Sequence, residues 1–409
     1  MVARARFDDD QRRARLAVRH CLAPGARADR AERAVDALVA VHATDPATVF
    51  LAVSARLAVP GVADTERALY RDGTVLRRHG MRNTLFVVPA ELAPVVHAST
   101  TAKLAARERA RMLKDFAASG RDAAWTARIE AAVRSALADA APDALAPDAT
   151  AAAPDPEAGL TGSQLSELVP ELREGIDYGV GTSYQATQPV GMRLLRVLGI
   201  EGSMVRRRPV GSWTSSRHRW VPGPPVAAAP SAAERNGAQA ELTRKWLAAY
   251  GPATEADLVW WTGWGVREVR AALAACAAVE VELADGSAGF VLPDDLEPVA
   301  APAPWAALLP ALDPTAMGWK QRDWYLSPEH HAALVDRTGN LGPTVWWDGR
   351  VIGGWAQRPD GDVVFELLTD PGAAARKAVT AEADALRDLL ADTRVTPRFR
   401  TPLERRLTS

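Results

Sequence analysis

The stretch "VHATDP" (residues 41–46) places an imidazole, a hydroxyl and a carboxylate close together between two apolar segments. His42 and Thr44 are two residues apart where a helix gives way to a turn. On a locally extended backbone their side chains therefore emerge on the same side. A donor and an acceptor held in this way can position one water molecule, which is what a hydrolase needs. The pattern predicts a hydrolytic site formed by His42, Thr44 and Asp45.

Each of these residues also has a purely structural interpretation. Pro46 fits the first turn of a helix, and Asp45 just before it is a favoured N-cap. Thr44 could be a second capping hydroxyl. His42 falls seven residues after Val35, on an apolar helix face where a hydrogen-bonded buried histidine is a common finding. The sequence leaves both interpretations open, with Asp45 adding negative potential only if it is not used as a cap.

The elements around this stretch follow the order of a winged helix. Helices followed by a short helix and a two-stranded hairpin form this relative of the helix-turn-helix, which places one helix against DNA. Asp64 is expected to cap the short helix. The expected elements are helices over residues 10–22, 30–41 and 46–57, a short helix from Asp64, and strands over 74–79 and 83–89.

The same order recurs twice along the chain. Residues 160–172 and 194–214 supply helices and a strand pair for a second unit. Residues 242–276 repeat the helical part more clearly, with Thr254 as a cap, and a hairpin follows around the turn at 285–286. The pattern predicts three tandem units.

Two segments rich in Ala and Pro, the first of them also rich in Asp, read as linkers between these units. After residue 305, short β runs are separated by Asp-Gly turns at 348–349 and 360–361, and a helix is expected at about 372–391. The predicted organisation is a first winged-helix unit at 1–136, a linker at 137–160, a second unit at 161–220, a linker at 221–236, a third unit at 237–304, and a β-meander or barrel with a C-terminal helix at 305–409.

Composition narrows the class of protein. The 409 residues are 48% hydrophobic and 24% charged, which is ordinary for a globular protein of two to four domains. Cys21 and Cys276 lie far apart without CxxC-type neighbours, which argues against a disulfide framework and a cysteine-built zinc site. No signal-peptide core and no run long enough to span a bilayer is found, so a cytoplasmic, nucleoid-associated location is expected.

Basic residues cluster although the net charge is only −1. Local patches decide whether a phosphate backbone can be held, and the alternative is that these arginines are solvated surface. Trp213 could be a base wedge or simple packing, and "GWKQRDWY" (318–325) could line a DNA channel through Lys320 and Arg322 or pack in the core. Phosphate contacts are expected from Arg77, Arg82, Asn83, Arg206, Arg207, Arg208, Arg217 and Arg219.

Nearly the whole chain resembles the AlkZ-like DNA glycosylases, also described as winged-helix DNA-binding domain proteins. The long strings that carry the resemblance are "LVAVHATDP", "HGMRNTLFVVP", "RLLRVLGIEGSMVRRRPVGSW", "YGPATEADLVWWTGW", "LLPALDPTAMGWKQRDWYL" and "DRTGNLGPTVWWDGRVIGGWAQR". The resemblance implies an α+β fold of three tandem winged helices around a concave DNA-binding face, with a small C-terminal β-barrel. It also implies hydrolysis of the N-glycosidic bond of bulky N7-alkylguanine adducts left by genotoxic natural products.

The catalytic motif of well-studied family members is two glutamines separated by one apolar residue and followed by Asp-Pro. In this chain the glutamine positions match His42 and Thr44, with Ala43 between them. Variant members of the family look like this. The hypothesis is that neutral His42 orients or deprotonates water and that Thr44 completes the hydrogen bonds of this water. No metal or cofactor is needed.

The leading interpretation is therefore a monomeric, monofunctional DNA glycosylase that acts on double-stranded DNA containing an alkylated purine. It requires His42 and Thr44 to face an open, positively lined groove. The alternative is a non-catalytic winged-helix regulator. A regulator usually dimerises to read two half-sites, whereas this sequence already carries three units and shows no heptad seam.

Overall fold

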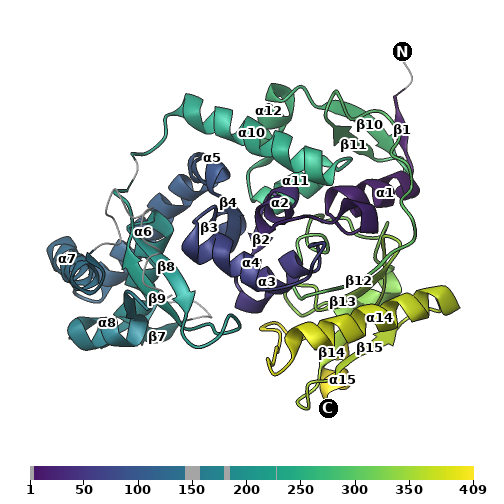
Figure 1. Cartoon of the computed structure of the whole chain (residues 1–409). Coiled ribbons are helices and arrows are strands. Elements are labelled where there is room, and N and C mark those ends of the chain that lie inside the picture. Colours follow the sequence, from purple (N-terminus) through teal and green to yellow (C-terminus); the bar gives the residue numbers. More distant parts are fainter. Residues whose placement is uncertain (1–3, 143–156, 179–184, 227) are drawn as a thin grey trace.

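The computed structural model describes residues 4–142, 157–178, 185–226 and 228–409 (Figure 1). Helices and small antiparallel sheets alternate along the chain, so the predicted mixed α+β class is confirmed. In Figure 1 the first unit, drawn in purple, lies between the teal second unit and the yellow-green C-terminal sheet. The candidate motif thus belongs to the unit that both of these parts flank.

The first unit is a three-stranded sheet with helices packed on it. The sheet order is β2-β4-β3, and Val41 and His42 pair with Val87 and Phe86. The hairpin predicted in residues 74–89 is confirmed. The elements are α2 (Ala31–Ala37), β2 (Val41–His42), α3 (Pro46–Ser54), α4 (Ala63–Glu66), a wider turn at Arg67–Arg71, β3 (Val75–His79) and β4 (Leu85–Pro89).

The prediction that Asp64 caps the short helix is wrong. Helix α4 begins at Ala63, and Asp64 lies inside it. Its carboxylate instead accepts a hydrogen bond of 2.6 Å from the backbone N–H of Ala31 at the start of α2. Asp64 therefore stabilises the N-terminus of a neighbouring helix, a tertiary role that local sequence does not indicate.

Long helices separate the first sheet from the second, and they were not predicted. Helices α5 (Ala93–Val96), α6 (Ala102–Ala118) and α7 (Ala123–Ala140) precede the second sheet, which is ordered β5-β9-β8. Helix α7 continues into the range 137–160 that reads as a linker, and residues 143–156 lie outside the described residues. The second unit contains β5 (Leu160–Thr161), α8 (Gly162–Leu168), β6 (Gly175–Tyr178), β7 (Ala186–Pro189), α9 (Val190–Glu201), β8 (Met204–Pro209) and β9 (His218–Pro222).

The third unit has the same helix-and-hairpin order. Thr254 caps its second helix as predicted, and its hydroxyl accepts from the backbone N–H of Asp257 at 3.1 Å. The hairpin at 285–286 is also confirmed, and β1 (Arg6–Phe7) adds a parallel strand to it. The elements are α10 (Ala232–Tyr250), α11 (Glu255–Thr262), α12 (Val266–Ala275), β10 (Val279–Leu283) and β11 (Ala288–Val291), preceded near the N-terminus by α1 (Asp9–Arg19).

The C-terminal part is a four-stranded meander in chain order. Both predicted Asp-Gly turns join its strands. Among the described residues the strands form an open sheet with β12 and β15 at its edges, and no closed barrel is found. Helix α14 packs along the sheet. The elements are β12 (Ala306–Leu309), α13 (His331–Leu334), β13 (Thr344–Trp347), β14 (Arg350–Gln357), β15 (Val363–Leu367), α14 (Ala373–Leu390) and α15 (Pro402–Thr408).

A buried ion pair fixes the first unit to the C-terminal part. The guanidinium of Arg56 and the carboxylate of Asp313 are both fully buried and form two hydrogen bonds of 2.8 and 2.9 Å. Thr48 of α3 also donates to the carbonyl of Ala311 at 2.8 Å. Because a buried charge is costly unless it is paired, these contacts hold α3 in one position relative to the C-terminal sheet.

Candidate active site

The backbone around His42 is set by a strained turn and a short edge strand. Val39 adopts φ +62°, a conformation that a β-branched residue rarely takes, at a cost of about 1–3 kcal/mol. Beyond this turn the chain pairs with β4, and the N–H of Ala43 donates to the carbonyl of Leu85 at 2.8 Å. Two residues later Asp45 caps α3, with Pro46 at the first helical position. The motif is thus held between an edge strand and a helix N-terminus.

The imidazole of His42 is buried without a hydrogen-bond partner. Its ring contacts that of Phe86 at a centroid distance of 4.8 Å, and the residue is 8% exposed. Neither ring nitrogen has a partner among the described residues. Burial, and then the nearby charge of Arg82, lower the pKa of His42 to about 3. The ring is therefore neutral near pH 7 and does not face an open groove in the free protein, contrary to the expectation from sequence.

Asp45 is fully engaged by the backbone. One carboxylate oxygen accepts from the N–H of Ala47 at 3.1 Å, and the other accepts from the N–H of Arg398 at 2.9 Å. Burial raises the pKa of Asp45, and the two backbone hydrogen bonds partly oppose that shift. Thr44 is half-buried, and its carbonyl accepts from the guanidinium of Arg398 at 3.4 Å. Asp45 is therefore the cap that its position indicated, and it also anchors the C-terminal segment.

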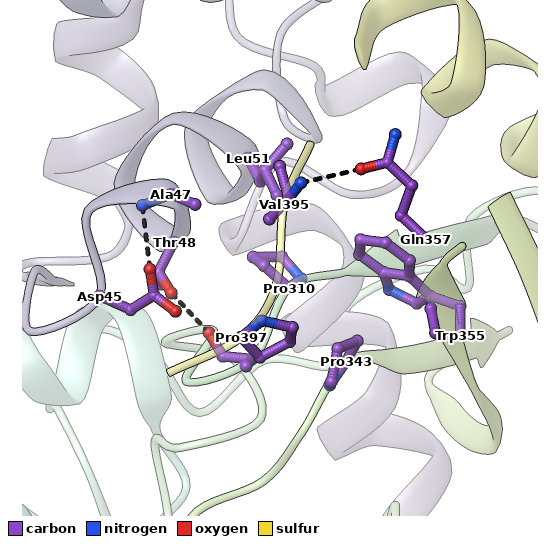
Figure 2. A pocket seen from close by; sticks show the side chains of 12 residues that line it. Asp45, Ala47, Thr48, Leu51, Pro310, Pro343, Trp355, Gln357, Val395 and Pro397 are labelled. Carbon is purple, nitrogen blue, oxygen red and sulfur yellow. Dashed lines mark hydrogen bonds between the residues drawn. The ribbon is translucent and has the colours of Figure 1, made fainter. Parts of the chain in front are cut away.

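A small apolar space adjoins Asp45 on the side of the C-terminal sheet (Figure 2). Its free volume is only about 10 Å³, and its walls include Leu51, Trp355 and several prolines. His42 is not among the residues that line it. In Figure 2 the carboxylate of Asp45 is turned toward Ala47. The space is a narrow gap between α3 and the C-terminal sheet.

Arg82 is the charged group that influences His42. It lies in the β3–β4 turn with φ +52°, and its guanidinium stacks 4.1 Å from the ring of Trp260. Arg322 stacks on the same ring at 5.1 Å. Burial and the charge of Arg322 lower the pKa of Arg82 to about 10, so it stays charged at neutral pH. Asn83, the next residue, has φ +59° and a buried side-chain oxygen without a partner among the described residues.

Arg322 itself is buried, whereas sequence left open whether it lines a channel. It is 9% exposed and donates to the carbonyl of Trp319 at 3.0 Å. Lys320 is exposed, and its backbone N–H donates to Asp257. Of this pair, only the ammonium of Lys320 is accessible to a ligand.

The structure brings together arginines of the first and second hairpins. Burial, and then the charges of Arg77, Arg398 and Arg196, lower the pKa of Arg206 to about 10. Arg206 also lies over the ring of Trp220 at 5.0 Å. Among the described residues, no carboxylate pairs with Arg77, Arg206, Arg207 or Arg398, although Arg77 contacts the hydroxyl of Tyr70 at 3.2 Å. Like charges held together without acidic partners make this part of the surface strongly positive.

The remaining residues that were predicted to contact DNA lie in other surroundings. Arg208 pairs with Glu66 of α4 at 2.9 Å, and Arg219 pairs with Glu157 at 2.8 Å. Arg217 is exposed. Trp213 is partly buried, and its ring lies 5.3 Å from that of Phe50 on α3, which favours packing over a base wedge. These ion pairs reduce the positive charge that Arg208 and Arg219 add to the surface.

Sequence reasoning missed Arg398. It comes from "TPRFR" (396–400), a segment without regular secondary structure that is more than 350 positions away from the motif. The two arginines in that short run are a weak signal of basic surface, and nothing in the sequence indicates contact with Asp45. His79 and His218, whose pKa values are lowered by burial and then by the charge of Arg206, were not among the predicted contacts although both lie in basic stretches of the sequence.

Comparison with known proteins gives the family. A family model described as DNA glycosylase AlkZ-like matches residues 35–389. The chain belongs to the AlkZ-like DNA glycosylase family. The structure is similar to that of Streptomyces sahachiroi DNA glycosylase AlkZ, with a TM-score of 0.66 and 22% sequence identity over 96% of this chain and 99% of that chain. No curated protein matches the sequence.

Membership of the AlkZ-like DNA glycosylases indicates a DNA substrate. Of the basic residues described above, Arg398 contacts the motif through the carbonyl of Thr44, and its charge acts on Arg206. Within the described parts of the chain, no group of three or more His, Cys, Asp or Glu side chains is placed to hold a metal ion. The same described parts contain no helix that is long and apolar enough to cross a membrane.

Proposed function

We propose that this chain is a monofunctional DNA glycosylase that hydrolyses the N-glycosidic bond of bulky N7-alkylguanine adducts or crosslinks in double-stranded DNA. It would act as a monomer in base excision repair and serve self-resistance to a genotoxic natural product. The observation that carries the proposal is the neutral, unpartnered imidazole of His42, near the charge of Arg82, in a member of a DNA glycosylase family.

The chemistry asked of His42 is modest. An N7-alkylated guanine is cationic, so the C1′–N9 bond breaks with its electron pair neutralising the departing base. A water oxygen then bonds to C1′, and one water proton is released. Burial keeps the imidazole neutral in the free protein, where its pKa is about 3. Once the site opens to DNA, the neutral ring would accept a hydrogen bond from the water and orient it, and a general base placed in this way typically contributes about 10²–10⁴-fold.

Thr44 and Asp45 have supporting roles in this proposal. The Thr44 hydroxyl supplies a second hydrogen bond to the water. Asp45 places a carboxylate at the N-terminus of α3, where the helix dipole is positive and opposes a cationic, oxocarbenium-like sugar. Its charge offsets that dipole even while its oxygens cap the helix. The motif contains no lysine, so a Schiff base and lyase chemistry are not expected from it.

Substrate binding has to open the site, because both ring nitrogens of His42 are covered in the free protein. Catalytic contacts often form only in the substrate complex. Three helix-and-hairpin units, each with the order of a winged helix, would place the DNA against the arginines of the first two hairpins. This arrangement suits bulky lesions, for which extrusion of the base requires a large pocket.

Base release from a defined substrate tests the proposal. The protein is incubated with duplex DNA carrying an N7-alkylguanine adduct, and free adducted base and abasic sites are quantified. Wild type is expected to release base and His42→Ala to lose release, while Lys377→Ala, an exposed control on α14, is expected to match wild type. Binding without release at any enzyme excess would contradict the proposal and support a winged-helix regulator.

A further inference from the structure

A basic groove lies between the turn after α13 and the C-terminal segment that leads into α15. The space measures about 760 Å³. Four arginines line it, and Asp336 is the acidic residue among its walls. The C-terminal segment that forms one wall is the same segment whose backbone is held by Asp45. The groove therefore begins beside the candidate active site. The four arginines are Arg337, Arg398, Arg400 and Arg405.

Most of this positive charge is not neutralised. Arg400 forms hydrogen bonds of 2.6 and 3.0 Å with Glu404 and is thereby paired. The carboxylate of Asp336 accepts from the side chains and backbone of its own turn, including Asn340 at 2.9 and 3.0 Å. Arg337, Arg398 and Arg405 are exposed, and no carboxylate pairs with any of the three among the described residues. The groove thus presents three free guanidinium groups.

Arg398 connects the groove with the arginines of the hairpins. Its guanidinium lies 3.4 Å from the carbonyl of Thr44, and its charge is close enough to Arg206 to lower the pKa of that residue. Positive charge therefore continues from Arg77 and Arg206, past the motif, into the groove. An extended run of like charges suits a polyanion better than a small ligand.

We propose that this groove binds the phosphate backbone of the DNA duplex next to the lesion, with Arg337, Arg398 and Arg405 as phosphate contacts. The inference rests on the proposed function only for the identity of the ligand. Guanidinium groups suit this role because their planar donors form paired hydrogen bonds with phosphate oxygens. Arg398 additionally acts as a positioning residue, since the residue that would contact phosphate also contacts Thr44 and Asp45.

Binding of unmodified duplex DNA over a range of salt concentrations tests the groove. The variant Arg337→Ala/Arg405→Ala removes two exposed charges, and Arg376→Ala/Lys377→Ala removes two charges from α14 as a matched control. Each lost phosphate contact is expected to reduce the slope of log K against log salt by about 0.9. At about 0.1 M salt this corresponds to roughly eightfold weaker binding per contact, and the difference shrinks toward 1 M.

A third variant, Arg398→Ala, tests the remaining guanidinium group of the groove. Its backbone N–H still donates to Asp45, so the variant keeps the contact that holds the segment and loses only the guanidinium. It is expected to lower the salt slope by about 0.9 as well. Melting temperatures close to that of wild type would show that all three variants are folded.

The outcomes separate this inference from the proposed function. A reduced slope in the groove variants, with the control unchanged, supports the groove even if no base is released from adducted DNA. An unchanged slope and affinity in the groove variants overturn it, even if base release is normal. An equal loss in the α14 control also overturns it, because the effect would then reflect net charge rather than this surface.

Discussion

The first and third units differ at one equivalent place, the junction between the first strand and the following helix. In the third unit, Ala253 pairs with Phe290 and the chain then enters α11. Asp257 there is fully buried, and it accepts from the N–H and hydroxyl of Thr254 and from the backbone N–H groups of Lys320 and Gln321, all within 2.9 Å. Every donor around this carboxylate is therefore satisfied.

At the corresponding junction of the first unit, some buried polar atoms have no hydrogen-bond partner among the described residues. Asp45 accepts two backbone hydrogen bonds, but both nitrogens of His42 are buried without a partner among the described residues. Leaving a buried polar group unpaired costs about 1–3 kcal/mol. Because His42 lies in the segment matched by a DNA glycosylase family model, its unpartnered ring makes it the candidate for meeting a ligand in the complex. The comparison teaches that the third junction is structural and that the first is the candidate for chemistry.

The largest effect on stability is expected at the third junction. Asp257→Ala would leave two backbone N–H groups and the Thr254 pair without their acceptor. The free energy of unfolding is expected to fall by about 3 kcal/mol or more, as determined from urea denaturation. The same measurement on His42→Phe is expected to differ from wild type by less than about 1 kcal/mol, because no hydrogen bond is lost. Equal losses for the two variants would remove the contrast between the junctions.

A smaller loss is expected for Asp45→Ala. This change removes the cap of α3 and the contact to the N–H of Arg398, at a cost of about 1–2 kcal/mol in the free energy of unfolding. Asp45→Asn keeps an acceptor for the cap and should recover part of that loss. If both variants are as stable as wild type, Asp45 is not the structural tie that its hydrogen bonds indicate.

The pH dependence of stability gives a further test of the first junction, through the buried ring of His42. The folded-state pKa of His42 is about 3, below the ordinary value near 6.5, so the unfolded chain binds more protons between these values. Its stability contribution is present above pH 6.5 and is lost as the pH falls toward 3. Melting temperatures should therefore fall from pH 7 to pH 4, and less steeply in His42→Phe than in wild type. Parallel curves would show that His42 is not buried as a neutral ring.

The smallest effect is expected for Thr44→Ala. No hydrogen bond of its hydroxyl supports the fold in the described structure, so the free energy of unfolding should change by less than about 0.5 kcal/mol. Base release should be slowed, and less so than in His42→Ala. A large loss of stability without a change in rate would assign the hydroxyl to folding alone.

Sequence alone predicted the elements that local chemistry fixes. The Thr254 cap, the Asp-Gly turns and the helix at about 372–391 follow from short-range rules, and the structure confirms them. Helices α6 and α7 were not predicted, although Asp122 caps α7 and the buried residues of both helices recur every three to four positions. Asp64 was misassigned because its partner, Ala31, is brought to it only by tertiary packing.

The candidate site was also predicted only in part, because some of its contacts are local in sequence and others are not. The motif could be located from residue types, and Asp45 from its place before Pro46. The burial of His42 depends on Phe86 and Arg82 in a separate hairpin, and the contact of Asp45 with Arg398 joins distant ends of the chain. Sequence spacing carries no information about such contacts. The pairing of Arg208 and Arg219 with acids was hidden in the same way.

The most direct test compares His42→Phe with wild type in single-turnover base release, with enzyme in excess over duplex DNA carrying an N7-alkylguanine adduct. Phenylalanine keeps an aromatic ring in the space beside Phe86 and removes both ring nitrogens, the N–H donor as well as the acceptor. The expected result is a rate constant lowered by about 10²-fold or more at equal DNA occupancy and undiminished stability. An unchanged rate constant would show that the unpartnered imidazole does not serve the chemistry.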